Sequence, residues 1–101
     1  MNAPRYLCSE LVTLRIAASA SIVNLEEIWR EGAILESEDA VEDGVGVEIQ
    51  CSDVLFAGRV IQVEHHEFGW RVEVEFSAET LWDKERFQPQ HMLDVDRPGI
   101  E

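Results

Sequence analysis

The sequence has 101 residues, enough for one domain with a single modest core. Its hydrophobic fraction of 46 % and charged fraction of 29 % are those of a globular protein, which argues against a wholly disordered chain. The 21 acidic residues outnumber the 8 Lys and Arg residues, so the formal net charge is −13 at pH 7. Because nucleic-acid backbones and anionic membrane surfaces are bound through Lys and Arg, this charge argues against both partners.

No stretch approaches the roughly 18 apolar residues of a membrane span. The N-terminal residues do not form a signal sequence, so we expect a cytoplasmic protein without membrane insertion. The two cysteines, Cys8 and Cys51, are too few for a disulfide scaffold and suit a reducing compartment. We expect both to be small apolar residues of the core.

Apolar and polar residues alternate along the first third of the chain, which is typical of half-buried strands. Residues 11–17 show the pattern, because Val12 and Leu14 share one face. Shorter strands are expected at residues 21–28 and 32–35.

The stretch 36–44 is rich in acids and predicts a loop that charge repulsion keeps solvated. A second interpretation is that residues 36–43 form a docking surface for a basic partner.

The alternation continues at residues 45–51, 54–64 and 70–76, which predicts three more strands. Within the second of them, Val60 and Ile61 cannot both face one side of a regular strand. Either a β-bulge or burial on both faces would reconcile these two residues.

Residues 64–69 predict a hairpin loop in which Gly69 can adopt a positive φ. His65 and His66 in this loop suggest a metal site as one alternative function. Neighbours on a strand point to opposite faces, so both could bind one ion only from a loop.

A short helix is expected after the last strand. Ser77 can cap it, and Glu79 would lie in its first turn. Lys84 and Arg86 would lie in its last turn, before Pro89 ends it. The apolar residues that would pack this helix on the sheet are Leu81, Trp82 and Phe87.

Five or six short strands at hairpin spacing, followed by this helix, predict a mostly β protein. We expect a small antiparallel six-stranded β-barrel with a short C-terminal helix, since closing the sheet removes exposed edges. Residues 1–94 would form this single domain, and residues 95–101 a frayed tail.

Three stretches of the chain carry a family pattern. Residues 22–35 contain a glycine, Gly32, that is followed by small and apolar residues. Residues 57–61 contain Gly-Arg-Val, and residues 69–76 end in Glu-Phe. In this order and spacing the stretches resemble the PilZ domain, a family of bacterial cyclic di-GMP receptors. The resemblance implies a β-barrel that binds the nucleotide through an Arg-x-x-x-Arg pair and an Asp/Asn-x-Ser-x-x-Gly segment.

The chain departs from the arginine pair, because Arg5 is the only Arg before the first strand. If Arg5 is the second member, Met1 takes the first place; if it is the first, Ser9 takes the second. In either register one guanidinium, a fork of donors suited to phosphate and guanine, is absent.

The second motif departs as well. Counting back from Gly32 places Glu27 at the Asp/Asn position and Trp29 at the Ser position. Trp is far larger than Ser, and its indole only donates hydrogen bonds. Aligning Asn24 instead would leave the glycine three residues late, so we prefer the first alignment. The sequence therefore predicts a degenerate nucleotide site.

Trp29 has two interpretations, a plug at the barrel mouth or an exposed anchor for a protein partner, with Arg30 beside it. The sequence shows no Gly-rich phosphate loop, Gly-x-Ser-x-Gly elbow or His-Glu-x-x-His helix, so we expect no enzyme.

We expect a non-enzymatic regulatory or adaptor module that needs no cofactor and acts by binding another protein. Its binding residues would be Arg5, Glu27, Trp29, Arg30 and Gly32. The first alternative is a genuine cyclic di-GMP receptor that uses Arg5 and the loop at residues 27–32. The second alternative is a metal-binding protein that uses His65 and His66.

Overall fold

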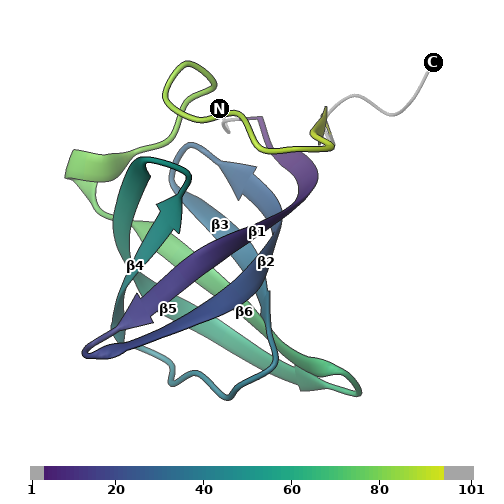
Figure 1. The fold of residues 1–101 in the computed structure, drawn as a ribbon, viewed down its shortest axis with the longest axis vertical. Coiled ribbons are helices and arrows are strands. Elements are labelled where there is room, and N and C mark those ends of the chain that lie inside the picture. Colours follow the sequence, from purple (N-terminus) through teal and green to yellow (C-terminus); the bar gives the residue numbers. More distant parts are fainter. Residues whose placement is uncertain (1–3, 95–101) are drawn as a thin grey trace.

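The structure is a computed structural model that describes residues 4–94. Its strands are β1 (Tyr6–Ile16), β2 (Ser19–Trp29), β3 (Gly32–Ser37), β4 (Gly46–Cys51), β5 (Val54–His66), β6 (Gly69–Phe76) and β7 (Leu93–Asp94). All neighbouring strands are antiparallel, in the order β2–β3–β6–β5–β4–β1, and β1 also pairs with β2 to close the ring (Figure 1). The predicted antiparallel six-stranded β-barrel is therefore confirmed.

The seam between β1 and β4 is the shortest junction of the ring. The two strands pair only over residues 13–15 and 48–50. Nearer its start, β1 pairs instead with β7, through Tyr6 and Leu7. Between these two stretches, the main-chain N–H of Ser9 donates to the carbonyl of Gln90 at 3.1 Å. The segment before β7 thus completes the wall where β4 does not reach.

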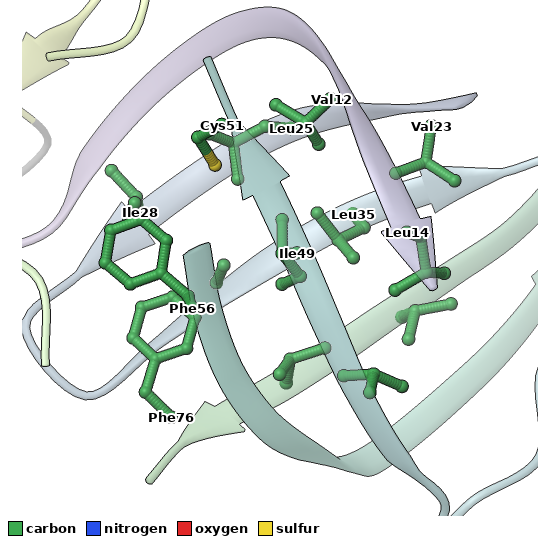
Figure 2. Close-up of a cluster of buried hydrophobic side chains, with 14 of the residues drawn as sticks. Val12, Leu14, Val23, Leu25, Ile28, Leu35, Ile49, Cys51, Phe56 and Phe76 are labelled. Atoms are coloured by element: carbon green, nitrogen blue, oxygen red, sulfur yellow. The ribbon is translucent and has the colours of Figure 1, made fainter. Parts of the chain in front are cut away.

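The barrel interior is filled by the apolar residues of the alternating pattern, which point inward because successive side chains leave a strand on opposite faces. Phe56 and Phe76 stack with ring centroids 5.0 Å apart at one end of this core (Figure 2). Every ring strand contributes, and the fully buried side chains include Leu14, Leu25, Ile28, Leu35, Ile49, Cys51, Phe56, Val60, Val72 and Val74.

Three register shifts interrupt the alternation, and one of them lies on β1 between Leu7 and Glu10. On β5 the pairing with β6 shifts between Val60 and Gln62, so Val60 is fully buried while Ile61 is 43 % exposed. This bulge resolves the ambiguity in the sequence, because an extra residue shifts the phase of the strand. On β2 the pairing with β3 shifts between Leu25 and Glu27, which lets both Leu25 and Ile28 face the core.

The predicted C-terminal helix is wrong. Between β6 and the last described residue, 94, the helical structure is one 3-10 turn, η1 (Ala78–Thr80), and Leu81 after it is extended, with φ −66° and ψ 150°. Ser77 makes no capping hydrogen bond, and its hydroxyl oxygen lies 3.0 Å from that of Thr80.

Hydrogen bonds from Thr80 to a distant strand explain why η1 does not extend into the expected helix. The hydroxyl oxygen of Thr80 accepts a hydrogen bond from the main-chain N–H of Ala57 at 3.0 Å. The same hydroxyl lies 2.9 Å from the carbonyl oxygen of Ala57, to which it can donate. Through these contacts, Thr80 binds backbone groups of β5. The capping and charge signals in the local sequence carry no information about such a distant contact.

The segment after η1 covers the end of the barrel where the chain starts (Figure 1). Trp82 is buried there. Its main-chain N–H donates a hydrogen bond to the carbonyl of Arg30, and its indole N–H donates one to the carbonyl of Phe87. The Tyr6 ring meets Trp82 edge-on at 5.6 Å, and Phe87 meets Phe56 at 6.4 Å. Trp82 and Phe87 thus pack on the barrel as expected, although from an extended segment.

The hairpin between β5 and β6 is tighter than expected, because strands continue through His66 and resume at Gly69. Gly69 has φ +156°, and a Cβ there would lie 2.5 Å from the carbonyl oxygen of Ser37. Within residues 4–94, no helix is long and apolar enough to cross a bilayer. The tail predicted at residues 95–101 lies outside the described residues.

Candidate functional site

Arg5 and Trp29 form a stacked pair on the outside of the barrel, at the end that Trp82 covers. Tyr6 pairs with Ile28 across β1 and β2, and this register places Arg5 opposite Trp29. The guanidinium carbon of Arg5 lies 3.8 Å from the centroid of the Trp29 ring. At this distance the cation is attracted to the electron-rich face of the indole.

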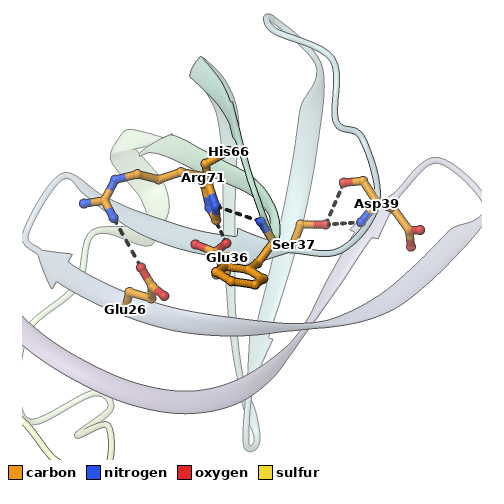
Figure 3. Close-up of polar contacts among 7 residues, drawn as sticks. Glu26, Glu36, Ser37, Asp39, His66 and Arg71 are labelled. Atoms are coloured by element: carbon orange, nitrogen blue, oxygen red, sulfur yellow. Dashed lines mark hydrogen bonds and ion pairs between the residues drawn. The ribbon is translucent and has the colours of Figure 1, made fainter.

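Glu27 holds Arg5 from a second side. The Nε of Arg5 lies 2.8 Å from the Oε2 of Glu27, whose side chain is only 14 % exposed. The other oxygen of Glu27 lies 3.9 Å from Arg71 on β6. Arg71 also bonds to Glu26 at 3.3 Å (Figure 3). Charges of alternating sign therefore run across the outer face of β2, β3 and β6.

The β2 bulge is the local reason for this arrangement. In a regular strand Glu26 and Glu27 would point to opposite faces. The extra residue at the bulge lets both carboxylates reach Arg71, while Leu25 and Ile28 on either side stay in the core.

Gly32 lies under the Trp29 ring, because the two residues pair directly across the β2–β3 hairpin. A Cβ at Gly32 would lie 2.9 Å from Cζ2 of Trp29 and 2.4 Å from the carbonyl oxygen of Val74. Trp29 is therefore half-buried between Gly32 and Arg5. The ring neither fills the barrel interior nor is fully exposed to solvent. Neither of the two interpretations, a plug or an exposed anchor, describes it completely.

Arg30 takes a different place from the other four residues expected in the site. It lies exposed at the turn between β2 and β3, and its carbonyl accepts the main-chain N–H of Trp82 at 2.9 Å. The structure thus brings together Arg5, Glu27, Trp29 and Gly32, with Arg30 at the rim.

The two histidines of the hairpin have separate partners. The His65 ring stacks on Trp70 with centroids 4.2 Å apart. The Nε2 of His66 contacts the carboxylate of Glu36 on β3 (Figure 3). Both histidines belong to β5, so they point to opposite faces. Among residues 4–94, no group of three or more His, Cys, Asp or Glu side chains is placed to hold a metal ion.

Both cysteines are buried free thiols, as expected of apolar core residues. Burial, together with the nearby charges of Glu10, Glu27 and Glu26, raises the pKa of Cys8 to about 12. Burial likewise raises the pKa of Cys51 to about 12, with Glu10 and Cys8 adding to the effect. At neutral pH both thiols are protonated, which makes them poor nucleophiles.

Sequence reasoning missed two features of this face. Arg71 was not expected in the site, because only the register between β3 and β6 brings it beside Glu26 and Glu27. Large apolar residues also lie exposed on the outer face of β1, β2 and β7. A signal for them existed, since Leu11 falls in the polar phase of its strand. These residues are Leu7, Leu11, Ile22 and Leu93.

Comparison with known proteins adds no relative: no protein-family model matches the chain, and no curated protein matches it significantly. The fold and the contacts of the site are therefore the basis for assigning a function.

Proposed function

We propose that this chain is a PilZ-like barrel that acts as a non-enzymatic regulatory or adaptor module in bacterial cyclic di-GMP-type signalling. In this proposal its nucleotide site is degenerate, and the module works in the cytoplasm by binding another protein. The binding face would be the outer surface around Arg5, Glu27, Trp29, Arg30 and Gly32.

The observation that carries the proposal is the engagement of Arg5 within the chain. Its guanidinium stacks on Trp29 and pairs with Glu27 at 2.8 Å. A nucleotide phosphate would have to compete with this carboxylate and ring for the one arginine that precedes β1 in the described part of the chain. Removing a charged hydrogen bond costs about 1.5–3 kcal/mol, roughly ten- to a hundredfold in affinity.

The charge around the site supports the same proposal. Glu26 and Glu27 both lie on this face, in a protein with a net charge of −13. Cyclic di-GMP carries two phosphates, so the surrounding field repels it. A protein partner instead can use the half-buried indole and the neighbouring arginines, which are the side chains that dominate binding hot spots.

Calorimetric titration with cyclic di-GMP tests the degenerate site. We expect no micromolar binding by the wild-type chain. Micromolar or tighter binding that Arg5→Ala abolishes would contradict the proposal and support the alternative, a genuine receptor that uses Arg5 and residues 27–32.

Partner capture tests the adaptor role. We expect Trp29→Ala to remain folded, because the ring lies outside the barrel core, and to lose the protein partner. Phe68→Ala is the matched control, since Phe68 is 82 % exposed at the β5–β6 turn. Equal capture by both variants would remove Trp29 from the binding face.

A further inference from the structure

We propose that the outer face of β1, β2 and β7 binds a basic amphipathic helix of the partner protein. This inference rests on the proposed adaptor function and names the partner's chemistry. The surface is the apolar ridge, which we define as Leu7, Leu11, Ile22 and Leu93.

The ridge consists of two exposed apolar pairs, Leu7 with Leu93 and Leu11 with Ile22. Leu93 pairs directly with Leu7 across β7 and β1. Ile22 pairs with Thr13, the second residue after Leu11, so Ile22 and Leu11 are diagonal neighbours on β2 and β1. The exposed fractions are 42 % for Leu7, 70 % for Leu11, 62 % for Ile22 and 64 % for Leu93. Exposed apolar side chains that gather on one face mark interaction sites, whereas scattered single ones do not.

The middle of the ridge is polar but uncharged. The hydroxyl of Ser9 lies 3.4 Å from the side-chain oxygen of Asn24, and Asn24 pairs with Leu11. Covering these neutral groups costs less than burying a charge. A partner that covers Ser9 and Asn24 therefore desolvates only neutral groups in the middle of the ridge.

The backbone of β2 favours a helix over an added strand. This strand pairs with β1 on one side and β3 on the other, so its main-chain groups are already used. A partner that lies over β2 must then bind through side chains. Leu7 and Leu11 are four residues apart with a bulge between them, so they are separated by at most about 13 Å. Residues eight apart on a helix are separated by about 12 Å, so two turns of a helix match the ridge.

The net charge of the chain determines the charge of the partner that this surface favours. Glu27 pairs with Leu7 across β1 and β2, and Glu26 lies at the bulge beside it. Both carboxylates are already paired, Glu27 with Arg5 and Glu26 with Arg71, so the charge of the whole chain decides which partner is attracted. With a net charge of −13 on the whole chain, Lys and Arg on the partner helix complement this surface. A second copy of this chain would instead meet repulsion.

The experiment pans a display library of random 20-residue peptides against the full chain. We expect enriched peptides to be basic, with apolar residues on one helical face, and to bind at least tenfold more weakly at 500 mM than at 50 mM NaCl. Leu11→Thr combined with Ile22→Thr should weaken these peptides at least tenfold. Thr keeps strand propensity, so the variant retains its fold.

Leu55→Thr combined with Ile61→Thr is the matched control, because it removes one leucine and one isoleucine that are 45 % and 43 % exposed on β5. This variant should bind as the wild type does. Enrichment of no peptide, enrichment of acidic peptides, or equal binding by both double variants would overturn the inference. A dimer that dissociates only in the Leu11/Ile22 variant would also overturn it, in favour of a second copy.

Two further outcomes separate this inference from the proposed function. Peptides that depend on Trp29 but not on Leu11 and Ile22 would refute the ridge and leave the adaptor role intact. Cyclic di-GMP binding lost in Arg5→Ala would refute the degenerate site, while salt-sensitive peptide binding at the ridge would still support the present inference.

Discussion

Gly32 determines how Trp29 is presented. The indole can lie flat on the sheet only because residue 32 has no side chain beneath it. The Arg5 guanidinium lies on the other face of the ring, so the indole is held between the backbone at Gly32 and this cation. A binding residue that is immobilised before contact loses less conformational entropy when a partner arrives.

We expect Gly32→Ala to destabilise the protein by about 1–3 kcal/mol, because the added methyl would lie 2.4 Å from the Val74 carbonyl oxygen. Chemical denaturation measures this change. Gly46→Ala is the control, since the nearest atom to its Cβ would be 4.0 Å away. An equal effect of the two substitutions would contradict the close approach at Gly32.

The strands show how much of the fold the sequence predicts. Alternation predicted strands at residues 11–17, 45–51 and 70–76, because a half-buried strand must alternate whatever its neighbours are, although β1 begins five residues earlier than expected. The bulge near Ile61 was one of two possibilities that the sequence left open, and the register shifts at Glu26 and between Leu7 and Glu10 were not foreseen. All three depend on pairing with a neighbouring strand.

The C-terminal segment shows where sequence reasoning fails. Its capping and charge signals were local, but the contacts that determine its shape are distant: Thr80 with Ala57, and Trp82 with Arg30. The candidate site follows the same rule. Glu27, Trp29 and Gly32 were grouped by their spacing on one hairpin, whereas Arg71 comes from another strand.

We expect Thr80→Val to destabilise the protein by about 1–3 kcal/mol, because it leaves the partly buried N–H of Ala57 without its hydroxyl acceptor. Thr80→Ser is the matched control and should stay near wild type, since it keeps the hydroxyl. Thermal unfolding of the two variants provides the comparison. Equal melting temperatures would show that η1 is held by packing alone.

At the scale of the whole molecule, charge is the dominant feature. A net charge of −13 on a chain with a Cα radius of gyration of 13.0 Å places like charges within or near one Debye length at physiological salt. The described ion pairs of Arg5 and Arg71 offset only part of this repulsion. The compact state is therefore under electrostatic stress.

We expect the melting temperature to rise as NaCl is increased from about 10 to 300 mM, because salt screens repulsion across this range. A variant with Glu38→Gln, Glu42→Gln and Asp43→Asn should show a shallower rise, since it removes three exposed charges from the loop between β3 and β4. A fall in melting temperature with salt would mean that attractive pairs outweigh the repulsion.

The short junction between β1 and β4 has a consequence for how the barrel opens. Three residues on each strand form that ladder, while the first half of β1 is closed by Gln90 and β7. Loss of these few hydrogen bonds would open the barrel between β1 and β4, while the ladders that join β2, β3, β6 and β5 stay paired. Amide deuterium exchange would then begin beside Ser9, and solvent would reach the Cys8 thiol long before global unfolding.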